Sequence, residues 1–301
     1  MRLITCLAVA GLAWAAIGHA EAQDTAAASA SPSTIEGSQR YTLTSAKTQR
    51  RYLVDVLPID SIVKPVPADY RRPVIYVLDG NSLFPLVSHV AKAIGLFSSQ
   101  VPGVLVVSIG YPRDATLSYA ENVKTQLAWR TRDLSPPVTA GTQPEGTGGA
   151  ADFLGFITQE LKPFIASRYA VDPEEQTLAG HSLAGLFAVY TMFSDARAFS
   201  RYVAISPSLF WDDHAMNRRA VEFGKRRDLA STRLFVAVGE QETKERMGED
   251  MIGDARQFVS VLQAANPSGL EVQLQVFPDE NHMTVVPVAL TRGLLQVKAL
   301  R

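Results

Sequence analysis

The chain has 301 residues, of which 47% are hydrophobic and 20% are charged, and its formal net charge at pH 7 is −1. This is the composition of a globular protein whose core is large enough to fold without disulfide bonds. The small net charge excludes a strong electrostatic attraction to nucleic acids or to anionic membrane surfaces. A single cysteine, Cys6, excludes a disulfide within the chain.

The N-terminus has the pattern of a secretory signal peptide. Arg2 precedes an apolar run at Leu3–Ile17, which is too short to span a bilayer, and a small-x-small cleavage pattern follows at residues 20–22. We predict a signal peptide at residues 1–22, with cleavage after Ala22 or after Ala20 and an uncleaved anchor as the alternative. The mature protein is then periplasmic or secreted, and it has no stable insertion in a membrane.

Small and polar residues at 23–38 predict a disordered leader. Residues 39–301 then have the pattern of one catalytic α/β domain. Alternating residues at Arg40–Thr44 and Arg51–Pro58 predict an N-terminal antiparallel hairpin. Continuous apolar runs at Pro73–Gly80 and Val104–Gly110 predict strands that are covered on both faces. Later apolar segments predict further strands, with helical patterns between them. The predicted strands are Pro73–Gly80, Val104–Gly110, Leu178–Gly180, Tyr202–Pro207, Arg233–Gly239 and Glu271–Pro278, and the predicted helices are Leu83–Leu96, Ala151–Tyr169, the segment after Ser182, Met251–Ala265 and Val286–Lys298.

This alternation of strands and helices predicts a mainly parallel sheet with helices on both faces. The stretch Ala128–Gly149 interrupts the alternation because it is long and rich in proline, glycine and threonine. We predict a surface excursion there, of the kind that often forms a functional loop.

The segment Gly180-His181-Ser182-Leu183-Ala184-Gly185 resembles a nucleophile elbow, in which a serine lies on a tight turn between a strand and a helix. Such a turn exposes the Ser182 hydroxyl and directs the N-terminus of the helix toward an oxyanion. The alternative is a serine that caps an ordinary helix. The usual elbow pattern is Gly-x-Ser-x-Gly, and Ala184 occupies the position of its second glycine. Alanine adds one methyl group, which we expect this position to tolerate.

A serine nucleophile needs a base. Among the histidines, His282 follows the last predicted strand in a polar loop, which can return it to the sheet edge where the elbow lies. His89 lies in a helical pattern and is expected to be partly buried and structural, while His181 shapes the elbow. His214 is the second candidate, but it would require an unusual chain order. We therefore predict His282 as the base.

The acid of a triad orients the imidazole and stabilises its charged form. Glu242 stands shortly after a strand that lies between the nucleophile and the base, with Glu240 as the alternative and Glu245 as a weaker one. The order Ser182, Glu242, His282 matches the order nucleophile, acid, base of hydrolases with this elbow.

Two backbone N–H donors are needed to form an oxyanion hole beside the nucleophile. The N–H of Leu183 is the first, and the N–H of Asn81, or of Gly80, is the second, unless that loop is a plain turn.

Taken together, these motifs resemble the putative esterase family of α/β-hydrolases, which includes S-formylglutathione hydrolases, mycolyl transferases and, as the most similar branch, trilactone siderophore esterases. The resemblance runs from about Tyr41 to the C-terminus. It is carried by Tyr76–Gly80, Arg130–Pro136, Phe153–Tyr169, Gly180–Phe187, Ser206–Asp212 and Glu280–Val285. Ala184 stands where the family usually has glycine and Ser135 where threonine is common. Some members of the branch use a Ser-His dyad, which leaves the role of Glu242 open.

The resemblance implies an α/β-hydrolase fold and hydrolysis of a small-molecule carboxylic ester, with catechol-bearing trilactones among the candidate substrates. Arg130 or Arg132 could pair with phenolate or carboxylate groups, and Trp211 could supply an aromatic wall. Their alternative roles are structural. We expect no metal or cofactor, because no cluster of ligand residues occurs at metal-binding spacing. An acyltransferase and a catalytically silent binding protein are the alternative functions, and the sequence does not define the oligomeric state.

Overall fold

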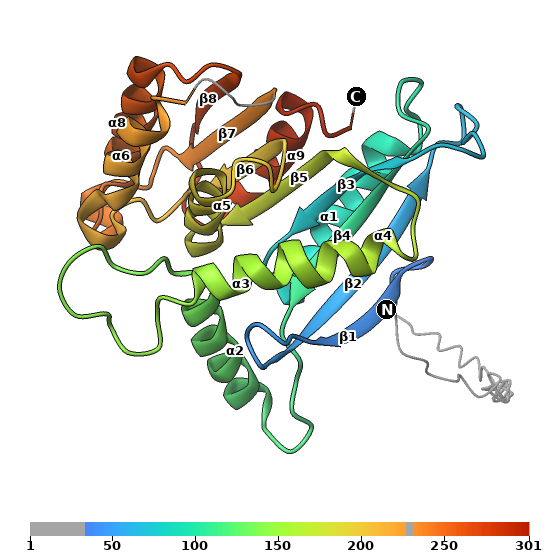
Figure 1. The fold of residues 1–301 in the computed structure, drawn as a ribbon, viewed down its shortest axis with the longest axis horizontal. Helices are drawn as coiled ribbons and strands as arrows, with labels where there is room; N and C mark the ends of the chain where they lie inside the picture. The colour runs from blue at the N-terminus through green and yellow to red at the C-terminus, as the bar shows by residue number, and fades with distance from the viewer. Residues whose placement is uncertain (1–33, 227–230, 301) are drawn as a thin grey trace, which may run out of the picture. The chain divides into compact units, whose positions relative to one another are not determined.

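A computed structural model describes residues 34–226 and 231–300 of the chain. The predicted signal peptide and most of the predicted leader, residues 23–33, lie outside the described residues. From Ile35 onward the chain forms one unit built on an eight-stranded sheet (Figure 1). The strands are β1 (Gln39–Thr44), β2 (Arg51–Asp60), β3 (Arg72–Val77), β4 (Gly103–Gly110), β5 (Val171–His181), β6 (Arg201–Ile205), β7 (Thr232–Gly239) and β8 (Leu270–Phe277).

The sheet has the order β1-β2-β4-β3-β5-β6-β7-β8. The β1–β2 and β2–β4 pairs are antiparallel, and all other neighbours are parallel. This confirms the predicted N-terminal hairpin and the mainly parallel sheet. After β3 the chain moves to one side to form β4, and β5 then returns to the other side of β3. The carboxyl ends of β3 and β5 therefore flank a topological switch point, where ligands bind in open α/β sheets.

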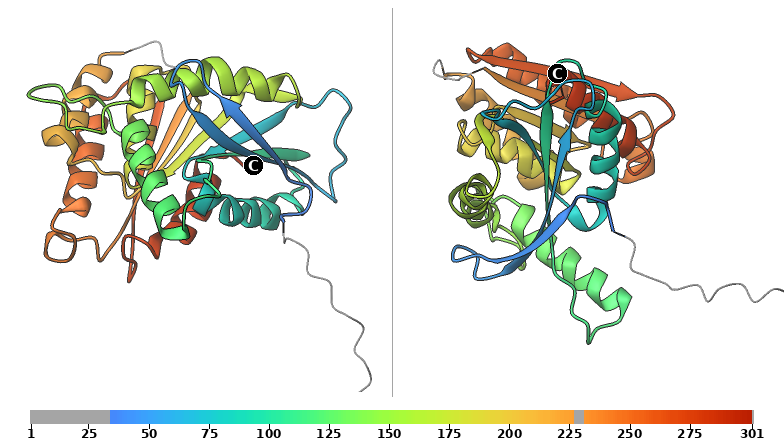
Figure 2. Two further views of the ribbon diagram at one scale, coloured as in Figure 1. Left: turned by 90° about the horizontal axis from the view of Figure 1, so that it is seen from below. Right: turned by 90° about the vertical axis from the view of Figure 1, so that its right-hand side faces the viewer.

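Helices cover both faces of the sheet (Figure 2). One face is covered by α1 and α9, and the other by α3, α5, α6 and α8. Each face buries its own apolar cluster, so the central strands are covered on both sides, as their continuous apolar runs predict. The helices are α1 (Gly80–Gly95), α2 (Tyr119–Leu134), α3 (Ala150–Phe156), the π-helical turn η1 (Ile157–Leu161), α4 (Lys162–Ala166), α5 (Leu183–Ser194), α6 (Trp211–Phe223), α7 (Lys244–Met247), α8 (Met251–Ala265) and α9 (Val285–Gln296).

The predicted surface excursion at Ala128–Gly149 is wrong in its first third. Residues 128–134 belong to α2, which starts in a capping box: the Ser118 hydroxyl accepts from the backbone N–H of Glu121, and the Glu121 carboxylate accepts from the backbone N–H of Ser118. Leu134 at the end of α2 is buried in the core. Capping and burial therefore outweigh the local composition, and the irregular loop begins at Ser135.

Two smaller expectations also need correction. His89 is exposed on α1 and is not partly buried. Helix α6 lies where no helix was expected, and its first turn has an unusual backbone: Asp212, Asp213 and His214 all have positive φ, between 47° and 57°. These three consecutive left-handed residues separate Trp211 from the regular part of the helix.

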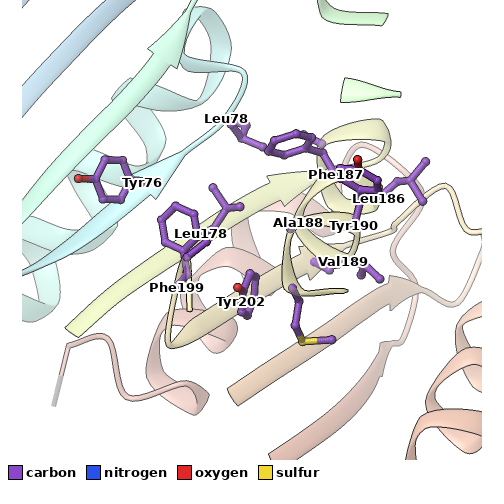
Figure 3. Packing of buried hydrophobic residues seen from close by; sticks show 14 of the residues in the cluster. Tyr76, Leu78, Leu178, Leu186, Phe187, Ala188, Val189, Tyr190, Phe199 and Tyr202 are labelled. Carbon is purple, nitrogen blue, oxygen red and sulfur yellow. The ribbon is translucent and has the colours of Figure 1, made fainter. Parts of the chain in front are cut away.

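The apolar helix α5 is the centre of the larger core cluster (Figure 3). Phe187 on this helix is fully buried, and its ring centroid lies 5.2 Å from that of Phe153 on α3. Figure 3 also shows Leu78, at the end of β3, close to the Phe187 side chain. Packing of this kind fixes α5, and therefore the turn that precedes it, against the sheet.

Truncation of this packing should destabilise the whole unit. Phe187→Ala is expected to lower the free energy of unfolding by about 3–5 kcal/mol, because a buried ring is lost and a cavity remains. The measurement is urea denaturation followed by circular dichroism. Leu127→Ala is the control, since Leu127 is 54% exposed and its loss should change stability by less than about 0.5 kcal/mol. Equal effects of the two substitutions would contradict this description of the core.

Candidate active site

Ser182 lies on a strained turn between β5 and α5. Its backbone has φ 60° and ψ −119°, a conformation that non-glycine residues rarely adopt and that is often found at functional sites. The turn is also tightly packed. A Cβ atom added at Gly180 would lie 2.4 Å from the carbonyl oxygen of Ala184, and one at Gly185 would lie 2.9 Å from that of Ile205. Glycine is required at these two positions, whereas the fully buried Ala184 has room for its methyl group.

The two predicted oxyanion donors, the backbone N–H groups of Leu183 at the start of α5 and of Asn81 at the start of α1, have no hydrogen-bond acceptor among the described residues, and the alternative donor, Gly80, has none either. Both lie directly after neighbouring strands, because β3 and β5 pair in parallel with Val77 opposite Ala179. The first N–H groups of a helix have no intrahelical partner and favour negative charge. The two loops therefore carry the free donors that an oxyanion hole needs.

Arg130 links these two loops to each other. Its guanidinium donates two hydrogen bonds to the Asp79 carboxylate, at 2.7 and 2.9 Å, and a third, at 3.0 Å, to the backbone carbonyl of His181. Asp79 precedes α1 in a left-handed conformation with φ 56°. A bidentate pair restrains both partners in a fixed geometry. Arg130 therefore fixes the residue before the nucleophile relative to the loop that carries Asn81.

Glu242 and His282 form a short, buried pair. The Nδ1 atom of His282 lies 2.6 Å from Oε2 of Glu242, which is fully buried. Its other oxygen, Oε1, accepts hydrogen bonds from the Ser206 hydroxyl and from the Gly239 backbone, each at 2.6 Å. An ionised carboxylate can only accept, so Nδ1 donates this bond, and in the neutral imidazole the lone pair is then on Nε2. The imidazole is thereby held in the tautomer that a general base requires.

Burial tends to raise the pKa of Glu242, but the hydrogen bonds from His282, Ser206 and Gly239 outweigh it, so the pKa lies below its usual value. The carboxylate is therefore ionised at neutral pH. The two alternative acids occupy other positions. Glu240 is exposed and accepts from the backbone N–H of Asp279, while Glu245 is exposed on α7. Of the three glutamates, only Glu242 contacts His282.

His181 fixes the loop that carries His282. Its Nε2 atom lies 2.8 Å from the His282 carbonyl oxygen, which can only accept, so His181 donates this bond. The two imidazole centroids are 4.5 Å apart. Burial, and secondarily the nearby His282, lower the pKa of His181 to about 4. His181 is therefore neutral at physiological pH and holds the base beside the elbow without adding charge to the site.

The Ser182 hydroxyl has one hydrogen-bonding contact in this structure. Its Oγ atom lies 3.5 Å from Oγ of Ser208, and the Ser208 backbone N–H donates to the Ser182 carbonyl at 3.2 Å. No hydrogen bond joins Ser182 to His282 among the described residues. Catalytic hydrogen bonds are often long in ligand-free sites and shorten when substrate is bound. Either hydroxyl could be the donor in this long contact, so it leaves the Ser182 proton available to His282.

The structure places the other predicted residues as follows. The Trp211 indole donates to the Pro136 carbonyl at 3.1 Å, and its ring is partly buried against the core. Arg132 pairs with its neighbour Asp133 at 2.7 Å. His214 lies 2.8 Å from Asp254 on α8 and does not contact Glu242 or His282. Contacts of Arg130 and Trp211 with substrate stay predictions, and both side chains have structural partners.

Ser206, Ser208 and Asp79 were not identified as site residues from the sequence. Ser206 and Ser208 flank a proline directly after β6, and Ser206 has a positive φ of 42°. The sequence signal for these two serines is a polar Ser-Pro-Ser turn at the carboxyl end of a central strand. The carboxyl ends of parallel strands lie at the same edge of the sheet, so such a turn lies near the elbow. Asp79 has no such signal, because its sequence context indicates only a turn.

No group of three or more histidine, cysteine, aspartate or glutamate side chains in residues 34–226 and 231–300 is arranged to hold a metal ion. In the same residues no helix has the length and apolar character needed to cross a membrane. The chemistry available at this edge of the sheet is that of a hydroxyl, an imidazole, a carboxylate and backbone N–H groups. These are the groups of a serine hydrolase of the α/β-hydrolase type.

Comparison with known families agrees with this class. The model of the putative esterase family matches residues 45–269. The chain therefore belongs to the putative esterase family, and it is an ester-hydrolysing enzyme.

Relatives within the family share most of the chain. Ferri-bacillibactin esterase BesA of Bacillus subtilis is 30% identical over 276 residues, which are 87% of this chain and 89% of the relative. The siderophore triacetylfusarinine C esterase of Aspergillus fumigatus is 29% identical and matches 74% of this chain and 80% of its own length. Among solved structures, the BES protein of Bacillus cereus is 28% identical, with a TM-score of 0.73 and coverage of 90% of this chain and 98% of that protein.

The role of Glu242 can be tested by substitution. Glu242→Gln is expected to lower kcat/KM about a thousandfold or more, because an amide no longer stabilises the imidazolium of His282.

Glu242→Gln should also change how the stability of the fold depends on acid pH. A lowered carboxyl pKa stabilises the fold above the unfolded value, about 4.3, and this stability is lost as the pH falls through the folded value. Thermal melts between pH 3 and 7 should show that loss in the wild type and a smaller one in the variant.

Glu240→Gln is the matched control, since Glu240 lies two residues away and is exposed. It should retain wild-type kinetics and the wild-type acid dependence. A Glu242→Gln enzyme with wild-type kcat/KM would indicate a Ser-His dyad.

Loss of the Arg130 link should affect the chemical step. Arg130→Gln removes the bidentate pair with Asp79 and is expected to lower kcat by about 10- to 1,000-fold, in the range of a lost oxyanion donor, with a smaller change in KM. Steady-state kinetics on a simple aryl ester measure both constants. Lys124→Gln, an exposed substitution on the same helix, is the control. An unchanged kcat in a folded Arg130→Gln protein would show that the link does not position the oxyanion donors.

Proposed function

We propose that the protein is an exported serine esterase that cleaves the ester bonds of a siderophore-type trilactone through an acyl-enzyme. The observation that carries the proposal is the 2.6 Å contact between Glu242 and Nδ1 of His282, beside a strained serine elbow. Relatives that match this chain over most of their length carry names of siderophore esterases, for bacillibactin and for triacetylfusarinine C. Export rests on the N-terminal sequence pattern alone.

The mechanism follows from the groups present. His282 takes the proton of Ser182 through Nε2 as the hydroxyl attacks the ester carbonyl, and Glu242 stabilises the imidazolium that forms. The N–H groups of Leu183 and Asn81 stabilise the tetrahedral oxyanion. His282 then gives its proton to the leaving alcohol, which leaves an acyl group on Ser182. A water molecule, activated by the same imidazole, hydrolyses this acyl-enzyme and restores the serine.

The test combines a covalent probe with a substrate panel. A fluorophosphonate should label the wild type and fail to label Ser182→Ala. The wild type should hydrolyse at least one of ferri-bacillibactin, enterobactin and triacetylfusarinine C, as followed by liquid chromatography. Ser182→Ala and His282→Ala should each lower turnover by at least about three orders of magnitude. Hydrolysis of simple aryl esters without hydrolysis of any siderophore would contradict the proposed substrate class, whereas the serine esterase activity would still stand.

A further inference from the structure

A cavity separate from the catalytic residues lies between α5, α6 and the loop that follows α2. Ser182, Glu242 and His282 do not line it. We call it the α6 pocket, and its lining includes Thr139, Phe193, Ala215, Arg218, Arg219 and Phe223. Its volume is about 360 Å³. A cavity of about 150 Å³ is large enough for benzene, so the α6 pocket can hold a ligand of about ten non-hydrogen atoms.

One wall of the α6 pocket is held in place by Thr139, on the loop between α2 and α3. The Thr139 backbone N–H and hydroxyl both donate to Oδ2 of Asp212, at 2.8 and 2.7 Å. The same hydroxyl accepts from Nη2 of Arg218 at 3.1 Å. In Figure 1 this loop runs from the end of α2 toward the first turn of α6. Hydrogen bonds therefore join the walls of the pocket before a ligand is bound.

Arg219 is a half-buried cation without an anionic partner. Its guanidinium donates to the Ser194 hydroxyl at 2.9 Å and lies 4.7 Å from the ring centroid of Tyr190. Within residues 34–226 and 231–300, no carboxylate oxygen lies within 4.0 Å of this guanidinium. Burial lowers the pKa of Arg219 below its ordinary value, because the charged form is partly removed from water. An anion in the pocket would offset this cost.

Arg218 adds a second cation, and its hydrogen bonds also go to neutral groups. It donates to the backbone carbonyls of Asp212 and Asp213, at 2.9 and 2.6 Å, whereas the nearest oxygens of their carboxylates are 3.7 and 3.9 Å away. Glu222 also lines the pocket, but both of its oxygens accept from Lys225 at 2.7 Å. The acidic group of the lining is therefore already paired, and the pocket has an excess of positive charge.

Two phenyl rings form the apolar walls, and other groups already cover their faces. The centroids of Phe193 and Phe223 lie 4.9 Å apart. The guanidinium of Arg219 lies 6.0 Å from the Phe193 centroid, and that of Arg226 lies 5.8 Å from the Phe223 centroid. What remains for a ligand is the ring edges and the methyl group of Ala215. These surfaces suit a flexible alkyl chain better than a flat ring, which needs a free aromatic face to stack on.

We propose that the α6 pocket binds an alkyl carboxylate of about eight carbons, a size that its volume can hold. The carboxylate pairs with Arg218 and Arg219, and the chain lies against Phe193 and Phe223. This site is independent of the ester chemistry at Ser182, because no group of the catalytic site lines it. It gives the enzyme a second ligand contact, beside the loop that Thr139 fastens to α6.

Calorimetric titration of the full chain with octanoate tests the site. Octanoate should bind the wild type more tightly than octanamide, which has the same chain and no charge, and more tightly than acetate, which has the charge and no chain. From butanoate to octanoate the affinity should rise by up to about fourfold for each methylene, the ratio expected when one methylene is buried. It should fall as salt rises, because Arg218 is partly exposed.

The double variant Arg218→Gln/Arg219→Gln should bind octanoate about tenfold more weakly, the loss expected from about one charge-assisted hydrogen bond, and should bind octanamide like the wild type. Arg218→Gln alone, a change at a half-exposed side chain, should show a smaller loss and serves if the double variant does not fold. Arg292→Gln, an exposed change on α9, is the matched control and should bind octanoate like the wild type.

Equal octanoate affinity in the wild type and in the folded arginine variants would overturn the inference, as would acetate binding as tightly as octanoate. Ser182→Ala should bind octanoate like the wild type, and a loss of binding there would place octanoate at the esterase site instead. Fluorophosphonate labelling tests the proposed function separately. Unlabelled protein that binds octanoate at Arg218 and Arg219 would contradict the esterase alone, whereas labelled protein that does not bind octanoate would contradict the α6 site alone.

Discussion

The hydrogen bond between the buried Glu242 carboxylate and the His282 imidazole determines what this site can do. Without it, nothing in the described residues would select the tautomer of His282 that presents a free Nε2. The carboxylate has no exposure to solvent, and its charge is compensated by three donors: His282, Ser206 and Gly239. A buried charge with fewer partners would be destabilising, so the surrounding turns are constrained to supply those donors.

The turns that surround this pair are strained at three neighbouring strand ends. Asp79 after β3, Ser182 after β5 and Ser206 after β6 all have positive φ, although none of them is glycine. Such residues persist only where packing and hydrogen bonds determine the conformation. Arg130 and the Glu242 carboxylate provide these bonds, and α5 packs against β5 and β6 on one face of the sheet. These hydrogen bonds hold the strained turns in place, so the backbone N–H groups of Leu183 and Asn81 are positioned before substrate is bound.

Much of the architecture could be predicted from the sequence, because strands covered on both faces appear as continuous apolar runs. The elbow, the hairpin and the parallel sheet follow from such local patterns. The end of α2 lies in a stretch whose composition suggests a loop, although the capping box of Ser118 and Glu121 and the burial of Leu134 favour a helix. The left-handed turn of Asp212, Asp213 and His214 has no periodicity to detect. Among the site residues, His282 is predicted from its position after the last strand, whereas position alone leaves Glu240 and Glu245 as alternatives to Glu242, and only the folded turn brings Glu242 to His282. The partner of Arg130 could not be predicted, because Asp79 is distant in sequence and only the fold brings it to α2.

The most direct test of the account is a crystal structure of the wild-type enzyme with a phosphonate bound covalently at the active serine. We expect a bond to Oγ of Ser182 and a phosphonyl oxygen within hydrogen-bond distance of the N–H groups of both Leu183 and Asn81. Nε2 of His282 should face the adduct, with Nδ1 still bound to Glu242. An adduct whose oxygen points away from Asn81, or a His282 ring separated from Glu242, would contradict it.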